Sequence, residues 1–560
     1  MKKRIIAALL LAFILLSGCS PKNGDSAERV DSELKKLQAE ETSQKAKRTV
    51  SLACSVTDSF CPYNAVTSLN REIAPLIYDS LIKLSDTFEA IYSLATDVKY
   101  DKEKVTVTIK NTTFSDGSVV TSDDVVYCAE KAIASKTRYA QALDDVESVS
   151  AASSNRVVFT LKKADPFFEN QLDFPIYKKG SDDKMSSDNI EIPPIGGGIY
   201  KINKAKTKLV LNDKYSGKKP TVETIKLIDT PDTDALNHNL EVGNITCYYS
   251  DLSDCELPQV RGGYKSVNIN NLVYLGANMK GGLMSHPEMR QAVSAALDRK
   301  SIVEEAYFQN ATPASSVFNP AWSELKDVVP SNENEASENV YLALLEEIGY
   351  NRKDSGGYFV NSEGERLKLS LVYYEDNKWR ASAAKLIKTD LKLAGIEIEL
   401  KKLSWKDYKT YLKEGYFDLY LAEVKIGNNM DISELVTKGG SVAFGVYYKN
   451  RKKEEKPNAE NLDEQNLEDV PKPEEKEETL EEKKEKYGGL TAEKLSEFYK
   501  GDASLADVAS AFATELPIIP ICYRTGILSY TTDISGMQPS SGDVYHGIGN
   551  SLIKKQTKGG

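Results

Sequence analysis

Hydrophobic and polar residues alternate in several short segments of the chain, and this pattern predicts half-buried β-strands. The alternation is clearest at 105–110 (VTVTIK) and 396–400 (IEIEL), and 156–161 (RVVFTL) is predicted to be another strand. Two further segments, 199–202 and 208–212, predict the strands of a hairpin. These strands are spread over most of the chain, so they belong to one or more sheets built from distant segments.

Helical periodicity appears between the strands. Thr121 and Asp124 have the spacing of a capping box, which predicts a helix from there to about residue 133. A second helix is predicted at 379–394, where apolar residues recur at helical spacing until Gly395. Because the strand at 396–400 follows directly, helices and strands alternate, which indicates an α/β fold.

The N-terminus has the parts of a secretory signal peptide. Three basic residues at 2–4 precede an apolar run at 5–16, which is too short to cross the roughly 30 Å of a bilayer core. The residues at 16–19, LSGC, resemble the lipobox of bacterial lipoproteins. We therefore predict a signal peptide at 1–18 and a diacylglycerol on Cys19; the alternative is an ordinary signal peptide whose cleavage region contains a cysteine.

Composition narrows the possible functions of the rest of the chain. The 560 residues suggest two or three domains, and no apolar run of membrane-spanning length follows Cys19. The net charge of −11 argues against a nucleic-acid partner, which needs a basic face. Residues 19–48 are polar and predict a disordered tether. Residues 451–486 are mostly charged and contain no aromatic residue, which predicts a disordered acidic insertion within a domain.

The cysteines and histidines of the chain indicate two possible disulfides but no metal-binding or catalytic motif. Cys54 with Cys61, and Cys247 with Cys255, are the natural local disulfide pairs, although the sequence cannot fix the connectivity. The chain has three histidines, which stand singly, and no CxxC motif, so we expect no metal site and no cofactor. No GxSxG or HExxH motif is present, so we expect no enzyme.

The segment 114–133, FSDGSVVTSDDVVYCAEKAI, resembles the signature of the bacterial extracellular solute-binding proteins of family 5. The matching positions are Phe114, Asp116, Gly117, Thr121, Asp124, Val125 and Val126. Further resemblances follow in order at 289–314, at 379–400 and at 515–523 (ELPIIPICY). The signature itself has turn and cap chemistry, which favours a structural role over ligand contact.

The resemblance implies a two-lobed periplasmic-binding-protein-like α/β fold of type II, of the large peptide-binding variety with an extra subdomain. The ligand cleft would lie between lobes that close by hinge motion. The implied ranges are 49–85, 194–280 and 518–556 for lobe I, 86–193 for the subdomain with the signature, and 281–517 for lobe II.

The implied function is that of a monomeric, lipid-anchored subunit of an ABC importer, on the extracytoplasmic face of the cell membrane. It would capture short peptides and deliver them to the permease and its ATPases. Two alternatives stay open: the same role for a non-peptide solute such as a sugar or a nickel chelate, and a surface interaction or adhesin lipoprotein that uses the same fold.

Ligand residues are harder to predict. In oligopeptide binders of this family, an aspartate shortly after a Phe-Asp strand accepts the α-amino group of the peptide. Phe417 and Asp418 are present, but the expected position falls near Gly427; Asp431 could serve instead, or could cap the helix that follows. The candidates are Tyr63, Asn64, Tyr274, Asn278, Trp379, Asn428, Asn429, Asp431, Phe444 and Tyr447.

Overall fold

The computed structural model describes residues 50–260, 262–325, 328, 336–446 and 489–551. Five predicted features lie outside the described residues: the signal peptide (1–18), Cys19, the tether (19–48), the acidic insertion (451–486) and Tyr447. None of the described helices is both long enough and apolar enough to cross a membrane.

The main element of the described chain is a mixed sheet of eleven strands. The strands follow the order β12 (Tyr200–Ile202), β13 (Lys208–Leu211), β14 (Thr224–Asp229), β1 (Val50–Cys54), β15 (Cys247–Ser250), β23 (Ile518–Thr531), β16 (Gly262–Ala277), β22 (Leu419–Lys425), β20 (Lys368–Tyr374) and β21 (Glu397–Leu403), with β17 (Ala311–Pro313) paired to β23. β12 and β13 form the predicted hairpin. The sheet therefore brings the first and last strands of the described chain within two positions of each other.

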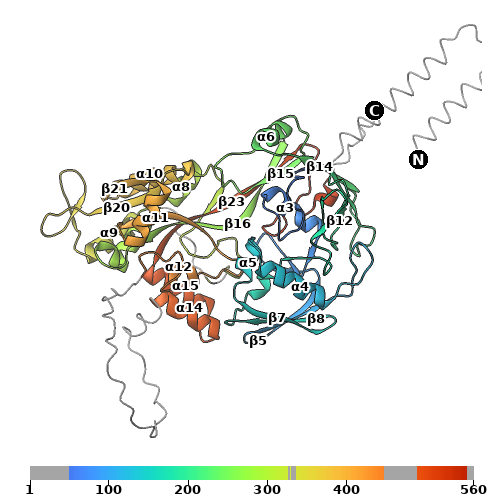
Figure 1. Cartoon of the computed structure of the whole chain (residues 1–560). Helices are drawn as coiled ribbons and strands as arrows, with labels where there is room; N and C mark the ends of the chain where they lie inside the picture. Colours follow the sequence, from blue (N-terminus) through green and yellow to red (C-terminus); the bar gives the residue numbers. More distant parts are fainter. Residues whose placement is uncertain (1–49, 261, 326–327, 329–335, 447–488, 552–560) are drawn as a thin grey trace, which may run out of the picture. The chain divides into compact units, whose positions relative to one another are not determined.

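β16 and β23 are the longest strands, and they pair antiparallel over most of their length (Figure 1). β23 also pairs with β15, and β16 also pairs with β22. The register between the two long strands shifts between Asn268 and Asn271, so Ile269 and Asn270 have no partner on β23. Such a bulge bends a strand and increases its twist. The two halves of the sheet are thus joined through a bent segment.

The buried hydrophobic side chains form two main clusters on the two sides of this bend. One cluster takes most of its members from residues 50–247, and the other takes most of its members from 272–527. β16 contributes Val267 to the first cluster and Leu272 to the second. The boundary between the two cores therefore coincides with the bulge.

A second sheet of four antiparallel strands shares the first core. Its order is β5 (Ala95–Asp101), β6 (Lys104–Ile109), β8 (Arg156–Leu161) and β7 (Val146–Ser153), and it is accompanied by α4 (Ser122–Ile133) and α5 (Arg138–Ala142). The predicted capping box is confirmed, because Asp124 Oδ2 accepts hydrogen bonds at 2.8 Å from the N–H and from the hydroxyl of Thr121.

The remaining helices lie along both halves. They are α3 (Ser68–Ile77), α6 (Thr233–Glu241), α7 (Pro287–Ala295), α8 (Arg299–Ala306), α9 (Glu338–Glu347), α10 (Lys378–Leu393), α11 (Trp405–Glu414), α12 (Ser433–Val436), α14 (Leu490–Lys500) and α15 (Leu505–Glu515). Two-stranded ladders join β2 (Asp79–Ser80) to β9 (Pro175–Ile176), β3 (Ile82–Leu84) to β4 (Ala90–Tyr92), β10 (Lys184–Met185) to β11 (Glu191–Ile192), and β18 (Arg352–Lys353) to β19 (Phe359–Val360).

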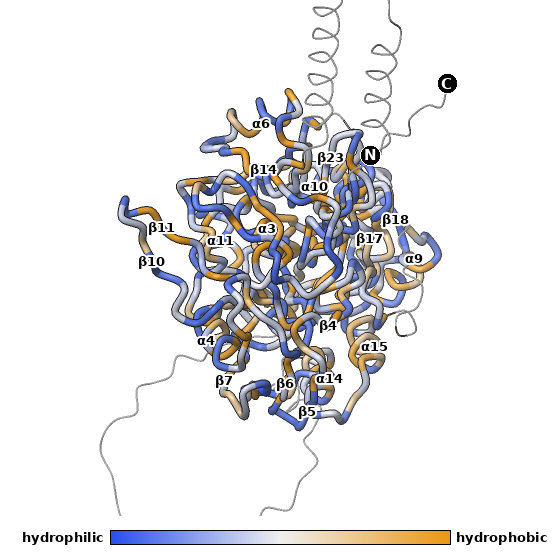
Figure 2. Tube along the Cα trace, turned by 90° about the vertical axis from the view of Figure 1, so that its right-hand side faces the viewer, coloured by the Kyte–Doolittle hydropathy of each residue, from blue (hydrophilic) through white to orange (hydrophobic). Residues whose placement is uncertain are grey.

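Glycines follow two of the helices, and Gly395 does so where the sequence predicts it. Gly395 follows α10 with φ +90°, and Gly415 caps α11 with φ +76°. Because this left-handed conformation is strained for other residues, glycine is the natural end of both helices. Hydrophobic and hydrophilic positions alternate over short distances along the helices and strands in Figure 2, as expected for elements with one buried face.

Candidate functional site

A cavity of about 410 Å³ lies at the bulge of β16, where segments of both halves meet. Its lining comes from α3, from residues 136–139, from 248–254, from the bulge at 269–271, from Lys425 and Asn428, and from Ser541 and Gly542. Ligand cavities in proteins are typically about 300–1,000 Å³.

Charged side chains of both signs line the cavity, namely Glu72, Asp251, Asp254, Arg71, Lys136, Arg138 and Lys425. Glu72 and Lys425 form no ion pair with any described residue. Burial raises the pKa of Glu72, although nearby Arg138 and Lys425 act in the opposite direction. Burial and Arg138 both lower the pKa of Lys425. The pKa shifts of both side chains disfavour their charged forms, most clearly for the half-buried Glu72, since Lys425 is exposed at the end of β22.

Arg138 is the most firmly held cation of the cavity. Its Nη2 atom lies 2.7 Å from Oδ2 of Asp173, and its guanidinium lies 4.3 Å from the centre of the Tyr139 ring. The Tyr139 ring in turn contacts the buried Tyr63 ring edge to face, at 5.8 Å between centres. Because Arg138 is fixed to the first core in this way, it presents its charge in a defined position.

A hydrogen-bond network crosses the sheet at the bulge. Arg524 of β23 donates to Glu423 of β22 at 2.7 Å and to the carbonyl of Asp251 at 2.7 Å. Asn271 of β16 also donates to Glu423, at 3.0 Å. Glu423 and Arg524 thus connect both halves beside the cavity.

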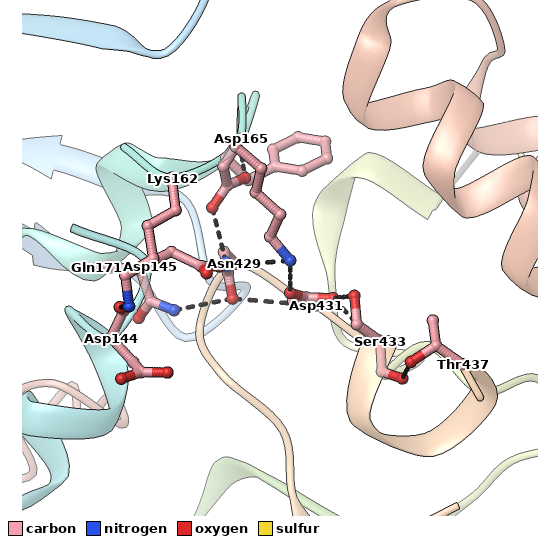
Figure 3. A network of polar contacts seen from close by, with 11 residues as sticks. Asp144, Asp145, Lys162, Asp165, Gln171, Asn429, Asp431, Ser433 and Thr437 are labelled. Carbon is pink, nitrogen blue, oxygen red and sulfur yellow. Dashed lines mark hydrogen bonds and ion pairs between the residues drawn. The ribbon is translucent and has the colours of Figure 1, made fainter. Parts of the chain in front are cut away.

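The two halves also meet at a polar seam between the four-stranded subdomain and the segment after β22 (Figure 3). The Asn429 side chain donates to Asp165 Oδ2 at 2.7 Å and accepts from Gln171 Nε2 at 2.8 Å. Asp165 also accepts from the N–H of Phe167 at 2.9 Å. Burial raises the pKa of Asp165 to about 6, even though both hydrogen bonds act in the opposite direction.

An ion pair extends this seam. Lys163 Nζ lies 2.7 Å from Asp431 Oδ2 and 3.3 Å from Asp145 Oδ2. Asp431 Oδ1 accepts from the N–H of Ser433, the first residue of α12, at 2.8 Å. Burial alone would raise the pKa of Asp431, but Lys163 and Ser433 outweigh it and lower the pKa. Asp431 therefore binds both the start of a helix and a cation of the subdomain.

The structure brings some predicted ligand residues to the junction of the halves. Asn428 lines the cavity, while Asn429 and Asp431 belong to the seam. Both carboxylate oxygens of Asp431 already have partners within the protein.

The other described candidates lie outside the cavity lining. Tyr63, Tyr274 and Trp379 are buried in the hydrophobic cores, and Phe444 is packed against one of them. Asn64 is exposed in a turn, where its N–H donates to the Cys61 carbonyl at 3.0 Å. Asn278 has a structural role, because its side chain donates hydrogen bonds to the carbonyls of Gly415 and Phe417, at 3.1 Å each.

The six described cysteines are free thiols, so neither predicted local disulfide is formed. Cys247 points into the first core from β15, whereas Cys255 packs against the second core. Cys54 and Cys61 are separately buried in the first core, where desolvation raises the pKa of the Cys61 thiol to about 11. The prediction from local spacing alone did not account for the different surroundings of each thiol.

Residues 89–441 match the family described as bacterial extracellular solute-binding proteins, family 5 (middle region). The chain belongs to this family. It is an ABC transporter substrate-binding protein, and proteins of this family are non-enzymatic transporter components.

Relatives and solved structures agree with this assignment. The oligopeptide-binding protein AppA of Bacillus subtilis (strain 168) is 25% identical over 428 residues, which cover 72% of this chain and 76% of AppA. The periplasmic murein tripeptide-binding protein MppA, in its unliganded open form, shares the fold with a TM-score of 0.68 and 18% identity, over 90% of this chain and 98% of MppA. NikA from Brucella suis, in complex with Fe(III)-EDTA, aligns with a TM-score of 0.62 and 16% identity, over 90% of this chain and all (100%) of NikA.

These comparisons confirm the predicted two-lobed α/β fold and the predicted family. The residue ranges predicted for the lobes and the subdomain stay predictions. Glu72, Arg138 and Lys425 were missed by sequence reasoning, because each looks like an ordinary surface charge until the fold brings them to one cavity.

Proposed function

We propose that the protein binds short peptides in the cavity at the bulge of β16. The observation that carries this proposal is the pair of opposite charges, Glu72 and Lys425, which line one cavity without an ion-pair partner among the described residues. A free peptide carries an ammonium and a carboxylate group at its two ends. Such a ligand would offer a partner of opposite sign to both charges at once.

Other features of the lining suit a peptide backbone. Asn270, Asn271 and Asn428 offer amide donors and acceptors next to the charged pair. The polar and charged lining fits a ligand with many hydrogen-bonding groups better than an apolar one. The names of two relatives, an oligopeptide-binding protein and a murein tripeptide-binding protein, support the same ligand class.

Isothermal titration calorimetry can test this function directly. Di- to hexapeptides with free ends should bind the purified protein, while the same peptides with an acetylated N-terminus and an amidated C-terminus should bind more weakly. Binding of a nickel–histidine chelate or of a sugar, with none of any peptide, would overturn the proposal in favour of a non-peptide solute.

We also propose that the protein is attached to the membrane by a lipid on Cys19 and delivers its ligand to an ABC permease. The LSGC segment at 16–19 and the short apolar run before it support the attachment. A Cys19→Ala variant should leave the detergent phase in Triton X-114 partitioning and should support less peptide uptake by cells. Cys255→Ala, at a partly exposed thiol in the folded chain, is the matched control and should behave like the wild type. Wild-type partitioning and uptake in Cys19→Ala would contradict the anchor.

A further inference from the structure

A second cavity, of about 920 Å³, lies next to the seam, since Lys163 and Asp165 belong to both. One wall of this cavity belongs to the four-stranded subdomain, and the other to α12, α14 and the residues that follow them. Figure 1 shows α14 beside the subdomain near β5. We name this cavity the lysine groove. A molecule bound in it would contact both halves of the protein.

The floor of the lysine groove is apolar and partly exposed. Leu495, Phe498 and Tyr499 line it from one face of α14, at the spacing of successive helical turns. Phe498 stacks against Phe167 of the subdomain, at 6.0 Å between ring centres. Tyr100 of β5 adds a ring that is 41% exposed. Exposed apolar surface with a polar rim is typical of a place where another segment binds.

Lysines dominate the charged lining of the groove. Five of the seven charged lining residues are lysines, namely Lys102, Lys162, Lys163, Lys438 and Lys500, and the two acids are Glu103 and Asp165. Lys163 and Asp165 already have partners at the seam. Lys102, Lys162 and Lys500 are exposed and form no ion pair with any described residue. These three lysines face only one exposed carboxylate of the lining, that of Glu103, so the rim favours an acidic occupant.

Both ends of the charged insertion adjoin this groove in the chain. The described residues stop at Val446, shortly after Lys438, and resume at Gly489, directly before α14. Glu515 fixes the start of α14, because its carboxylate accepts hydrogen bonds from the first two N–H groups of the helix, at 3.2 Å and 2.8 Å. A chain spans up to about 3.3–3.6 Å per residue, so the insertion is long enough to turn back onto the groove.

One segment of the insertion has the chemistry that the groove lacks. Residues 460–470 (ENLDEQNLEDV) contain five acidic residues, no basic residue and three large apolar residues, Leu462, Leu467 and Val470. A segment of this composition cannot bury its apolar side chains by itself. The lysine groove offers an apolar floor for them and a rim of opposite charge.

We propose that residues 460–470 dock in the lysine groove of the same chain. Leu462 and Leu467 pack on the aromatic floor, and the acidic residues pair with the three exposed lysines. Because the segment is tethered beside the groove, its effective concentration there is about millimolar, so contacts that are individually weak are sufficient. The inference goes beyond the proposed function and does not depend on which ligand the protein binds.

Carbodiimide crosslinking of the full-length protein, followed by mass spectrometry, tests the docking. This reagent joins a carboxylate to an amine only where the two are in contact. Links should form between residues 460–470 and Lys102, Lys162 or Lys500, and 1 M sodium chloride should reduce them at least fivefold. Lys406 on α11, which is also exposed, reports the background.

Substitutions in the segment separate docking from mere proximity. Leu462→Ser combined with Leu467→Ser keeps every charge and should reduce the links at least threefold, because the apolar contacts are lost. Leu480→Ser, in the same insertion but outside the segment, is the matched control and should leave the links unchanged. Links that survive the double substitution, or that stay at the level seen for Lys406, overturn the proposal.

A mixture of isotopically labelled and unlabelled protein shows which copy supplies the segment. The links should join residues of one copy; links mainly between labelled and unlabelled copies would overturn docking within the chain in favour of a second copy.

A synthetic peptide of residues 460–470 provides an independent measurement. In fluorescence anisotropy at low salt, it should bind a chain that lacks 451–486 at least tenfold more tightly than the full chain, whose own segment competes. Lys102→Glu with Lys500→Glu should weaken this binding at least tenfold, and Lys406→Glu should not. Equal affinity for both chains contradicts the proposal. Circular dichroism checks that the shortened chain folds, and if it does not, the crosslinks of the full chain decide.

Discussion

The seam and the cavity both lie between the two halves of the molecule, but they treat polar groups in opposite ways. At the seam, Asn429 connects Asp165 and Gln171, and Asp431 connects Lys163 and Ser433 (Figure 3). At the cavity, Glu72 and Lys425 stand without ion-pair partners among the described residues. Asn429 and Asp431 at the seam thus have partners within the protein, whereas Glu72 and Lys425 at the cavity are available to another molecule. A partner within the protein therefore indicates that these polar residues serve stability, and the lack of an ion-pair partner at the cavity indicates that they serve binding.

The largest expected effect is a loss of stability at the seam. Asn429→Leu leaves the buried Asp165 carboxylate and Gln171 amide without their partner, so the free energy of unfolding should fall by about 3–5 kcal/mol. Urea denaturation followed by circular dichroism measures this change. Asn64→Leu, at an exposed turn position, is the control. A loss below about 1 kcal/mol would show that the seam is not a structural contact.

Substitutions at the cavity should have the opposite effect: they should weaken ligand binding and leave stability unchanged. Lys425→Met and Glu72→Gln should weaken peptide binding by about 10- to 100-fold, since each removes a charged hydrogen bond to the ligand. Neither variant should lower the free energy of unfolding, because neither side chain has an ion-pair partner to lose.

Calorimetry and denaturation of the same samples check both parts of this expectation. Lys406→Met on α11 and Glu130→Gln on α4, both at exposed positions, are the matched controls. Unchanged peptide affinity in both cavity variants would contradict the binding role of the cavity.

The next largest expected effect is a pH-dependent contribution of the seam to stability, which the cavity residues do not share. The pKa of Asp165 is raised from 3.8 to about 6, so the folded protein binds this proton more tightly than the unfolded chain does. The contribution of Asp165 to stability is therefore fully present below pH 3.8, the pKa of the unfolded chain, and is lost as the pH rises through about 6. Asp165→Asn should remove this slope, which amounts to about 2 kcal/mol over that range.

Denaturation of wild type and Asp165→Asn at pH 4.5 and at pH 7 isolates this contribution, because the other acids titrate equally in both proteins. A constant difference between the two proteins at both pH values would show that Asp165 does not titrate in this range.

The smallest effect should come from the ion pair at the edge of the seam. Lys163 is 34% exposed, so solvent screens its contact with Asp431. Lys163→Met should lower the free energy of unfolding by about 1 kcal/mol or less, and 1 M salt should reduce the difference further. A larger loss that salt does not change would place Lys163 with the structural groups around Asn429.

Local elements of the fold could be read from the sequence because their signals are local. The capping box at Thr121, and the glycine between α10 and β21, each depend on neighbouring residues only. The full length of β16, Gly262–Ala277, could not be predicted, because only residues 272–275 have the apolar pattern of a buried strand. The polar residues before Leu272 belong to the strand through their pairing with β23, which is far away in sequence.

The site was harder to predict for a similar reason. Its lining comes from distant segments, and none of them has a recognisable motif of its own. Tyr274 was predicted from its place near the junction of the lobes and Trp379 as an apolar wall of the cleft, yet both are buried in the second core. Asn428 was found because the family resemblance places a ligand-binding aspartate near Gly427, after the Phe417-Asp418 strand, and Asn428 lies next to that position.

The pairing of β23 with β15, β16 and β17 has a consequence for how the protein is made. β23 lies between β15 and β16 and begins at Ile518, so the two halves of the sheet cannot be joined until more than 500 residues have been synthesised. Pairing over such long separations is also slow, because distant segments must meet before any contact stabilises them. Because this joining strand arrives last, we expect the chain to stay incompletely folded during synthesis, which is the state in which a protein that works outside the cytoplasm can be exported.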